Sequence, residues 1–213
     1  MKGLSDSFRD YVAVKPLNGE CGHQAGEFGL QDARAAITFQ SFPPVLHLQL
    51  RRYEYDVQCD DMVKVCIVSL LGLLLGSNIS SEINDGFEFP LEIDLDEFLD
   101  ETADKSEPWK YRLYSVLVHS GNPHGGHNFP LIKPDRYTWW LKFDDDRVIP
   151  VTDQKLLEDY GGEPLQRNHP TAMKRSTNAN ALVYIRKAVI DELMVPLTES
   201  DTPLHLGELI FGW

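Results

Sequence analysis

The chain has few cysteines, no excess of positive charge and no apolar run long enough for a membrane helix. Its three cysteines, Cys21, Cys59 and Cys66, are too few and too scattered for a disulfide framework, which favours a reducing compartment. The polar opening MKGLSDSFRD is unlike the apolar core of a signal peptide. The most apolar stretch, residues 65–76, is well short of the roughly twenty residues that span a bilayer. The sequence therefore predicts no membrane partner.

The composition is acidic and typical of a folded protein. The formal net charge is −13 and the sequence pI is about 4.9. This charge argues against nucleic acid as a partner and makes a basic protein surface the better candidate. With 42% hydrophobic residues among 213, the chain can bury the core of one domain, or of one large piece of a domain.

The pattern of apolar residues predicts more strands than helices. Residues 45–50 alternate between an apolar face, which carries the leucines, and a more polar face, as a half-buried strand does. Between residues 111 and 152 the strands follow one another without crossover helices, which favours an antiparallel sheet and an α+β fold class. Short helices are expected in LDEFLDE, in DQKLLEDY and at the end of NALVYIRKAVIDELM.

Histidine and glycine are concentrated in VLVHSGNPHGGHNF, just before a predicted hairpin. The segments HNFPLI and TWWLKFDDD flank a Pro-Asp turn. If the hairpin is symmetric about the middle of this turn, the numbers of two facing residues add up to 271, and His127 faces Asp144. Facing residues have Cβ atoms about 4.5–5.5 Å apart, so the carboxylate can hold the imidazole. Such a carboxylate would fix the tautomer of the histidine, as a general base in nucleophilic catalysis needs.

Three other interpretations of these residues stay open. His127 and Asp144 can form an ordinary surface contact in a solvated acidic turn. A zinc site through His124 and His127 is a weaker alternative, because positions i and i+3 on a loop are poor ligand geometry and no third ligand lies nearby in the sequence. The segment Cys21–His23 indicates a metal only faintly, because no second cysteine pair accompanies it.

Six ordered blocks resemble the catalytic domain of ubiquitin-specific proteases, and most closely their herpesvirus-associated subfamily. The blocks are FPPVLHLQLRRYEYD, FEFPLEIDLDEFLDE, VLVHSGNPHGGH, KFDDDRV, DYGG and STNANALVYIR. The resemblance implies a papain-like cysteine peptidase fold, with a mainly antiparallel palm sheet, part of the fingers and no thumb. It also implies a thiol-dependent deubiquitinase of the nucleus and cytoplasm, which needs no cofactor or metal and has ubiquitin and ubiquitinated proteins as partners.

The same resemblance implies roles for individual residues. His127 would be the catalytic base and Asp144 the residue that orients it, which is the pair that the hairpin also indicates. A channel for the C-terminal tail of ubiquitin would be lined by Tyr53, His119, His124, Gly125, Gly126 and Asn128. Two positions depart from the family pattern. Asn128 stands where a tyrosine is usual, and Pro130 removes a ladder donor, which a strand tolerates at an edge or a bulge.

The nucleophile of this family is not found in the sequence. The family's cysteine lies far upstream of its histidine, in an Asn-rich and Gly-rich box that is absent from these 213 residues, and no cysteine here occupies its place. We therefore expect a partial catalytic domain that cannot hydrolyse ubiquitin conjugates by itself. The alternative is a catalytically inactive module that binds ubiquitin or another partner.

The resemblance also divides the chain into four parts. Residues 1–64 would belong to the fingers and palm, residues 83–200 to the palm segment with the histidine and aspartate, and residues 201–213 to a tail. Residues 65–82 form an apolar insertion without a counterpart in the family. A retained intron fits this insertion better than a real segment packed under the sheet, because so many apolar residues in a loop would favour aggregation.

Overall fold

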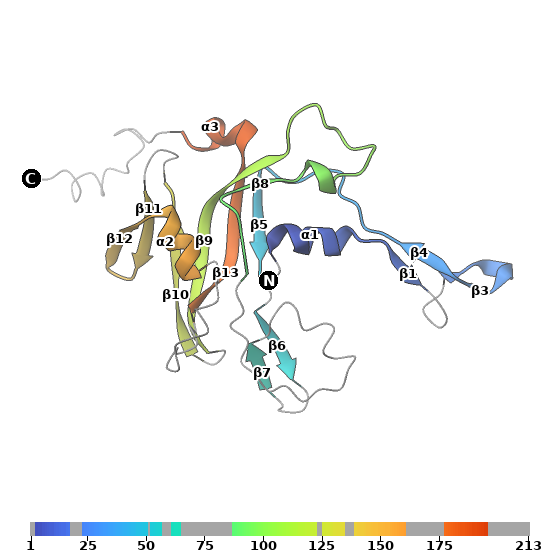
Figure 1. The fold of residues 1–213 in the computed structure, drawn as a ribbon, viewed down its shortest axis with the longest axis horizontal. Helices are drawn as coiled ribbons and strands as arrows, with labels where there is room; N and C mark the ends of the chain where they lie inside the picture. The colour runs from blue at the N-terminus through green and yellow to red at the C-terminus, as the bar shows by residue number, and fades with distance from the viewer. Residues whose placement is uncertain are drawn as a thin grey trace, which may run out of the picture.

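A seven-stranded antiparallel sheet organises the part of the chain that the structure describes. The structure is a computed structural model and describes residues 3–17, 23–50, 52–56, 61–64, 87–122, 125–134, 139–160 and 177–195. The strand order is β12-β11-β10-β9-β13-β5, and β8 also pairs with β9 (Figure 1). The strands are β5 (Val45–Gln49), β8 (Glu92–Asp94), β9 (Lys110–Asn122), β10 (Gly125–Ile132), β11 (Trp140–Asp144), β12 (Arg147–Val151) and β13 (Thr177–Arg186).

The 13-residue strand β9 is the spine of this sheet. One of its edges pairs with β13, while the other pairs first with β8 and then with β10. A register shift against β13 re-phases the alternation of side chains along β9. For this reason Tyr111 and Leu113 are buried in the first half of the strand, whereas Val116 and Val118 are buried in the second half. The core therefore follows β9 along its whole length.

The sequence-based prediction of a mainly antiparallel α+β fold is confirmed. At the edge of the sheet, Leu46 of β5 and Leu50 just after it are buried and Leu48 is half-buried, as the alternation predicted. The helix expected after β12 is α2 (Asp153–Tyr160), and η5 (Lys187–Val189) and α3 (Ile190–Leu193) follow β13. The helix expected in LDEFLDE is one turn of 3-10 helix, η4 (Asp96–Phe98).

The helix α1 (Leu4–Val12) is an element that the apolar pattern did not reveal. Its buried residues, Leu4 and Phe8, are four positions apart and so lie on one face. The ring of Phe8 lies 5.1 Å from that of Phe98, and 6.1 Å and 6.2 Å from those of Phe39 and Phe42. This aromatic cluster joins the first helix to η4 and to the segment that precedes β5.

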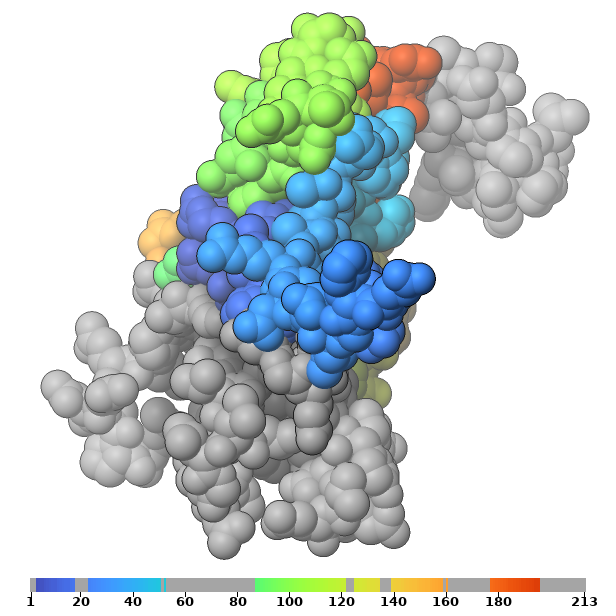
Figure 2. All heavy atoms as spheres, turned by 90° about the vertical axis from the view of Figure 1, so that its right-hand side faces the viewer, coloured from blue at the N-terminus to red at the C-terminus, as the bar shows by residue number. Residues whose placement is uncertain are grey.

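Beyond α1 the chain forms an arm that projects from the sheet (Figure 1). The arm consists of two short ladders and one 3-10 turn: β1 (Lys15–Leu17) with β4 (Ala33–Ala35), β2 (His23–Gln24) with β3 (Leu30–Gln31), and η2 (Gly26–Phe28). Figure 2 faces this arm and shows its side chains in front of the rest of the molecule. Phe28 is 81% exposed at the turn. A further pair, β6 (Tyr53–Asp56) with β7 (Asp61–Lys64), forms a separate ladder.

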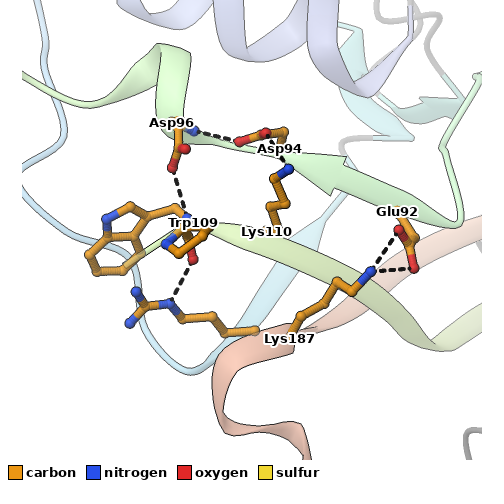
Figure 3. A network of polar contacts seen from close by, with 8 residues as sticks. Glu92, Asp94, Asp96, Trp109, Lys110 and Lys187 are labelled. Carbon is orange, nitrogen blue, oxygen red and sulfur yellow. Dashed lines mark hydrogen bonds and ion pairs between the residues drawn. The ribbon is translucent and has the colours of Figure 1, made fainter. Parts of the chain in front are cut away.

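Polar contacts hold β8 and the 3-10 turns against β9 at the end of the sheet that is opposite His127 along the strand (Figure 3). The ammonium of Lys187 lies 3.0 Å from both carboxylate oxygens of Glu92. The backbone N–H of Trp109 donates to Oδ1 of Asp96 at 2.8 Å, and Lys110 pairs with Asp94 at 3.7 Å. These contacts are largely exposed, so we attribute alignment of the strand ends to them and little stability.

Several sequence-based predictions concern residues outside those that the structure describes. These residues are the three cysteines, His124, the apolar insertion at 65–82 and the tail at 201–213. Among the described residues, no helix is long and apolar enough to cross a membrane.

Two buried tyrosines tie loop carbonyls to the sheet. The hydroxyl of Tyr111 donates to the carbonyl oxygen of Pro43 at 2.8 Å, and that of Tyr184 donates to Pro90 at 2.7 Å. Both residues are fully buried. Burial raises the pKa of Tyr111 to about 12 and also raises the pKa of Tyr184. The folded state therefore keeps protons that the unfolded chain loses near pH 10.

These tyrosines predict a loss of stability at alkaline pH. A tyrosine whose pKa is raised on folding contributes stability below pH 10 and loses it as the pH rises to its folded pKa. For Tyr111 this range is from pH 10 to about 12. The free energy of unfolding, measured by urea titration, should fall by up to about 1.4 kcal/mol per pH unit for each such tyrosine.

The variant Tyr111→Phe should cost about 1 kcal/mol at neutral pH, because the Pro43 carbonyl loses its donor. It should also flatten the alkaline slope. Tyr11→Phe is the control, since Tyr11 is 51% exposed. An alkaline slope that is equally steep in Tyr111→Phe would contradict the assignment to this residue.

Candidate active site

His127 and Asp144 meet at one end of the sheet, on neighbouring strands. His127 comes from the third position of β10, and Asp144 is the last residue of β11. Nε2 of His127 lies 2.6 Å from Oδ1 of Asp144. The side chain of His127 is 45% exposed and that of Asp144 is 28% exposed. The two side chains therefore hold each other through this contact, while part of the His127 ring stays accessible to a reactant.

The register of the hairpin differs from the predicted one, although the contact is present. Leu131 pairs with Lys142 and Ile132 with Leu141, so the numbers of facing residues add up to 273 and not to 271. In this register Asp144 stands level with Phe129, and His127 is its diagonal neighbour. The predicted register was wrong by two residues, but a shift of two leaves every side chain on the same face. Histidine and aspartate side chains can reach across such a diagonal.

Asp144 is held by a second partner on its own strand. Nζ of Lys142 lies 2.6 Å from Oδ2 of Asp144, while His127 contacts Oδ1. Residues two apart on a strand point to the same face, which explains why the lysine reaches the carboxylate. Hydrogen bonds from Lys142 first, and from His127 second, lower the pKa of Asp144. The carboxylate is therefore ionised and acts only as an acceptor.

A buried phenylalanine, Phe129, packs against both His127 and Lys142. Phe129 is 5% exposed, and its ring lies 5.8 Å from the ring of His127. The ammonium of Lys142 sits 3.9 Å from the centre of the same ring. From the other side, Tyr160 at the end of α2 meets Phe129 edge-on at 5.9 Å. The helix α2 thus supports the histidine through Phe129.

Two hydroxyls continue the row of His127 across the sheet. His127 faces Ser120 on β9, and Ser120 faces Thr177 on β13. The two hydroxyl oxygens lie 2.8 Å apart. The sequence alone marks neither Ser120 nor Thr177 as a site residue, because only the strand register brings positions 120, 127 and 177 together. No local motif could have revealed this row.

His119 and Asn128, predicted to line the ubiquitin tail channel, face each other in the next row of the ladder. Successive residues of a strand point to opposite faces, so these two side chains lie on the face opposite His127. Tyr53 begins β6 and pairs with Lys64 of β7. Pro130 lies in the part of β10 that pairs only with β9, because the ladder to β11 begins at residue 131. It therefore occupies an edge, as its missing donor requires.

Gly125 and Gly126, both predicted to line the ubiquitin tail channel, differ in their surroundings. A side chain at Gly126 would meet the ring of His119 and, at 2.6 Å, the carbonyl oxygen of Ser120. A side chain at Gly125 would meet nothing within 4 Å. The space around Gly125 is therefore open, whereas at Gly126 the absence of a side chain makes room for His119.

A metal ion is a poor fit at this site. His127, Asp144 and Asp145 have ligand atoms within 4.8 Å of one another. However, Nε2 of His127 is already hydrogen-bonded to Asp144. The ammonium of Lys142 contacts the same carboxylate and would repel a metal cation bound there. Of the proposed zinc pair, His124 lies outside the described residues. The geometry describes an imidazole oriented by a carboxylate, which is an arrangement for proton transfer.

Residues 3–184 match the family model described as "Ubiquitin carboxyl-terminal hydrolase". The chain belongs to this family. Ubiquitin carboxyl-terminal hydrolase 15 of Schizosaccharomyces pombe is 47% identical over 210 residues, which are 97% of this chain and 17% of that relative. Ubiquitin C-terminal hydrolase 12 of Arabidopsis thaliana is 40% identical, over 97% of this chain and 18% of the relative. The chain thus spans less than a fifth of these relatives.

The fold agrees with that of a solved structure. A chain of a SAGA DUB module superposes with a TM-score of 0.60, over 87% of this chain and 33% of that chain. The sequence identity is 21%. At this identity the likeness concerns the fold alone, a mainly antiparallel sheet with few helices.

The glycine pair predicts opposite effects of one methyl group. Gly126→Ala should destabilise the fold by about 1–3 kcal/mol, because the methyl meets the His119 ring and the Ser120 carbonyl oxygen. Gly125→Ala is the matched control and should be neutral, or stabilising by up to about 1 kcal/mol. Urea unfolding of both variants measures the difference. Equal stabilities would show that His119 does not occupy the space beside Gly126.

Proposed function

We propose that this chain carries the histidine base and the orienting aspartate of a thiol-dependent deubiquitinase. The enzyme hydrolyses the bond that follows the C-terminal glycine of ubiquitin, without a cofactor. One observation carries the proposal: in a member of the ubiquitin carboxyl-terminal hydrolase family, Nε2 of His127 lies 2.6 Å from Oδ1 of Asp144. Ubiquitin and ubiquitinated proteins are the proposed partners.

The contact assigns the two ring nitrogens of His127. An ionised carboxylate can only accept a hydrogen bond, so Nε2 carries a proton, and in the neutral ring Nδ1 then carries the lone pair. Nδ1 would remove the proton from a cysteine thiol, and the thiolate would attack the carbonyl carbon of the ubiquitin glycine. The imidazolium would then protonate the leaving amine. A water molecule, deprotonated by the same nitrogen, would release ubiquitin from the thioester.

The nucleophile, in this proposal, is none of Cys21, Cys59 and Cys66. The family's cysteine box does not occur in these 213 residues, and the curated relatives are several times longer. The chain alone would then supply half of the catalytic site and would not turn over. An inactive module that binds ubiquitin or another partner is the second candidate, and a full-length gene product without the cysteine box would favour it.

The finer assignments follow the same resemblance. We assign the main sheet to the palm of a papain-like domain and the exposed arm formed by β1 to β4 to the fingers, in the herpesvirus-associated subfamily. The ubiquitin tail would approach His127 across Gly125, where the backbone is open. His119, Asn128, Tyr53 and His124 remain predicted tail contacts, and the nucleus and cytoplasm remain the predicted compartments.

The test is turnover in the full-length gene product that contains residues 1–213. His127→Ala should lower kcat for a fluorogenic ubiquitin C-terminal amide by roughly 10²–10⁴, because the general base is lost. Asp144→Asn should also lower kcat and leave KM nearly unchanged, because the aspartate acts through His127 and not on ubiquitin.

His47→Ala is the matched control, since His47 is an exposed histidine of β5. Full activity of His127→Ala would refute the assignment of the base. A native protein that binds ubiquitin without hydrolysing it, and that does not react with a ubiquitin electrophile, would establish the binding module instead.

A further inference from the structure

The contact between Lys142 and Asp144 has no role in the steps proposed above. The ammonium of Lys142 lies 2.6 Å from Oδ2 of Asp144, the carboxylate oxygen that His127 does not contact. The lysine side chain is only 20% exposed. A lysine this far from water needs a charged or polar partner, and here that partner is the orienting aspartate.

The position of Lys142 is determined from two sides. The ring of Phe129 lies 3.9 Å below the ammonium, in a cation–π contact, and the carboxylate of Asp144 lies beside it. Phe129 is itself buried between His127 and Tyr160. The ammonium therefore has little freedom to follow a moving carboxylate.

Asp144 has other directions in which to turn. Rotation about the bond to an aspartate carboxylate is soft, so contacts decide its orientation. Arg147 stands directly opposite Asp144 on β12 and now pairs with Asp146 at 3.8 Å. Asp145 and Asp146, in the turn between β11 and β12, add negative charge. A carboxylate held by His127 alone can turn towards Arg147 and leave the imidazole.

We propose that Lys142 is a positioning residue, which fixes Oδ2 of Asp144 so that Oδ1 stays on Nε2 of His127. The role is one of orientation. Lys142 lowers the pKa of Asp144, but an ordinary aspartate is already ionised at neutral pH, so ionisation alone does not require the lysine. The consequence for turnover rests on the function proposed above, whereas the positioning itself does not.

The first test observes the imidazole directly, by NMR of the full chain labelled with 15N-histidine. In the native protein, the ring nitrogens of His127 should show the single tautomer with hydrogen on Nε2. Lys142→Met keeps the apolar stem over Phe129 but removes the charge. It should give a mixture of both tautomers, while Lys142→Arg, which restores a donor, should restore the native signals.

Lys133→Met is the matched control. Lys133 is also 20% exposed, lies 5.8 Å from the ring centre of Trp140 and pairs with Asp153 at 3.4 Å. Among the described residues, the carboxylate of Asp153 contacts Lys133 and the indole N–H of Trp140, and no histidine. It should leave the His127 signals unchanged. Native signals in Lys142→Met would overturn the proposal and reduce Lys142 to a packing residue.

The second test measures turnover in the full-length protein. Lys142→Met should lower kcat about tenfold with KM unchanged, because a small displacement of the base slows proton transfer, and the proposal gives the lysine no contact with ubiquitin. Lys142→Arg should recover most of the activity. If native protein does not hydrolyse ubiquitin substrates, the proposed function fails while the NMR result still decides the positioning role. Unchanged kcat in Lys142→Met of an active enzyme would overturn the proposal.

Discussion

The structure depends on the backbone ladder around β9. This strand pairs with β13 along one edge and with β8 and β10 along the other, and β10 in turn pairs with β11. Each ladder pair fixes which side chains meet and on which face. The row Thr177, Ser120 and His127 follows from this pairing, and so does the burial of Phe129 beneath the imidazole. A change of register by one residue would turn His127 to the other face.

The charged residues of the candidate site position one another in sequence, and the last of them packs against the core of the sheet. His127 depends on Asp144 for its tautomer, and Asp144 is held by both His127 and Lys142. Lys142 in turn rests on Phe129, which α2 supports through Tyr160. Lys142 and Asp144 are 20% and 28% exposed, whereas Lys187 and Glu92 at the other end of the sheet are 45% and 56% exposed, so the contact of Lys142 with Asp144 is screened less. The ion pairs in Figure 3 therefore hold their side chains in place less firmly than Lys142 and Asp144 hold each other.

The sequence predicted the contact of His127 with Asp144 but not the register that produces it. Alternation of apolar residues predicted β5 and the antiparallel sheet, and the resemblance to ubiquitin-specific proteases agrees with the family that residues 3–184 match. The hairpin register was wrong by two residues, yet the contact of His127 with Asp144 was found, because an even shift preserves the face. The helix α1 was missed because only tertiary packing buries its two apolar side chains.

The sequence by itself determined which side chains can take part, since a strand with period two decides which residues share a face before any partner is known. It placed His127 and Phe129 together on β10, and Lys142 and Asp144 together on β11. Only the tertiary structure decided how far the strands slide past each other, and so which of these residues touch. The register results from the joint packing of the core on β9, β13 and α2, and that packing is a property of the whole fold and of no single segment.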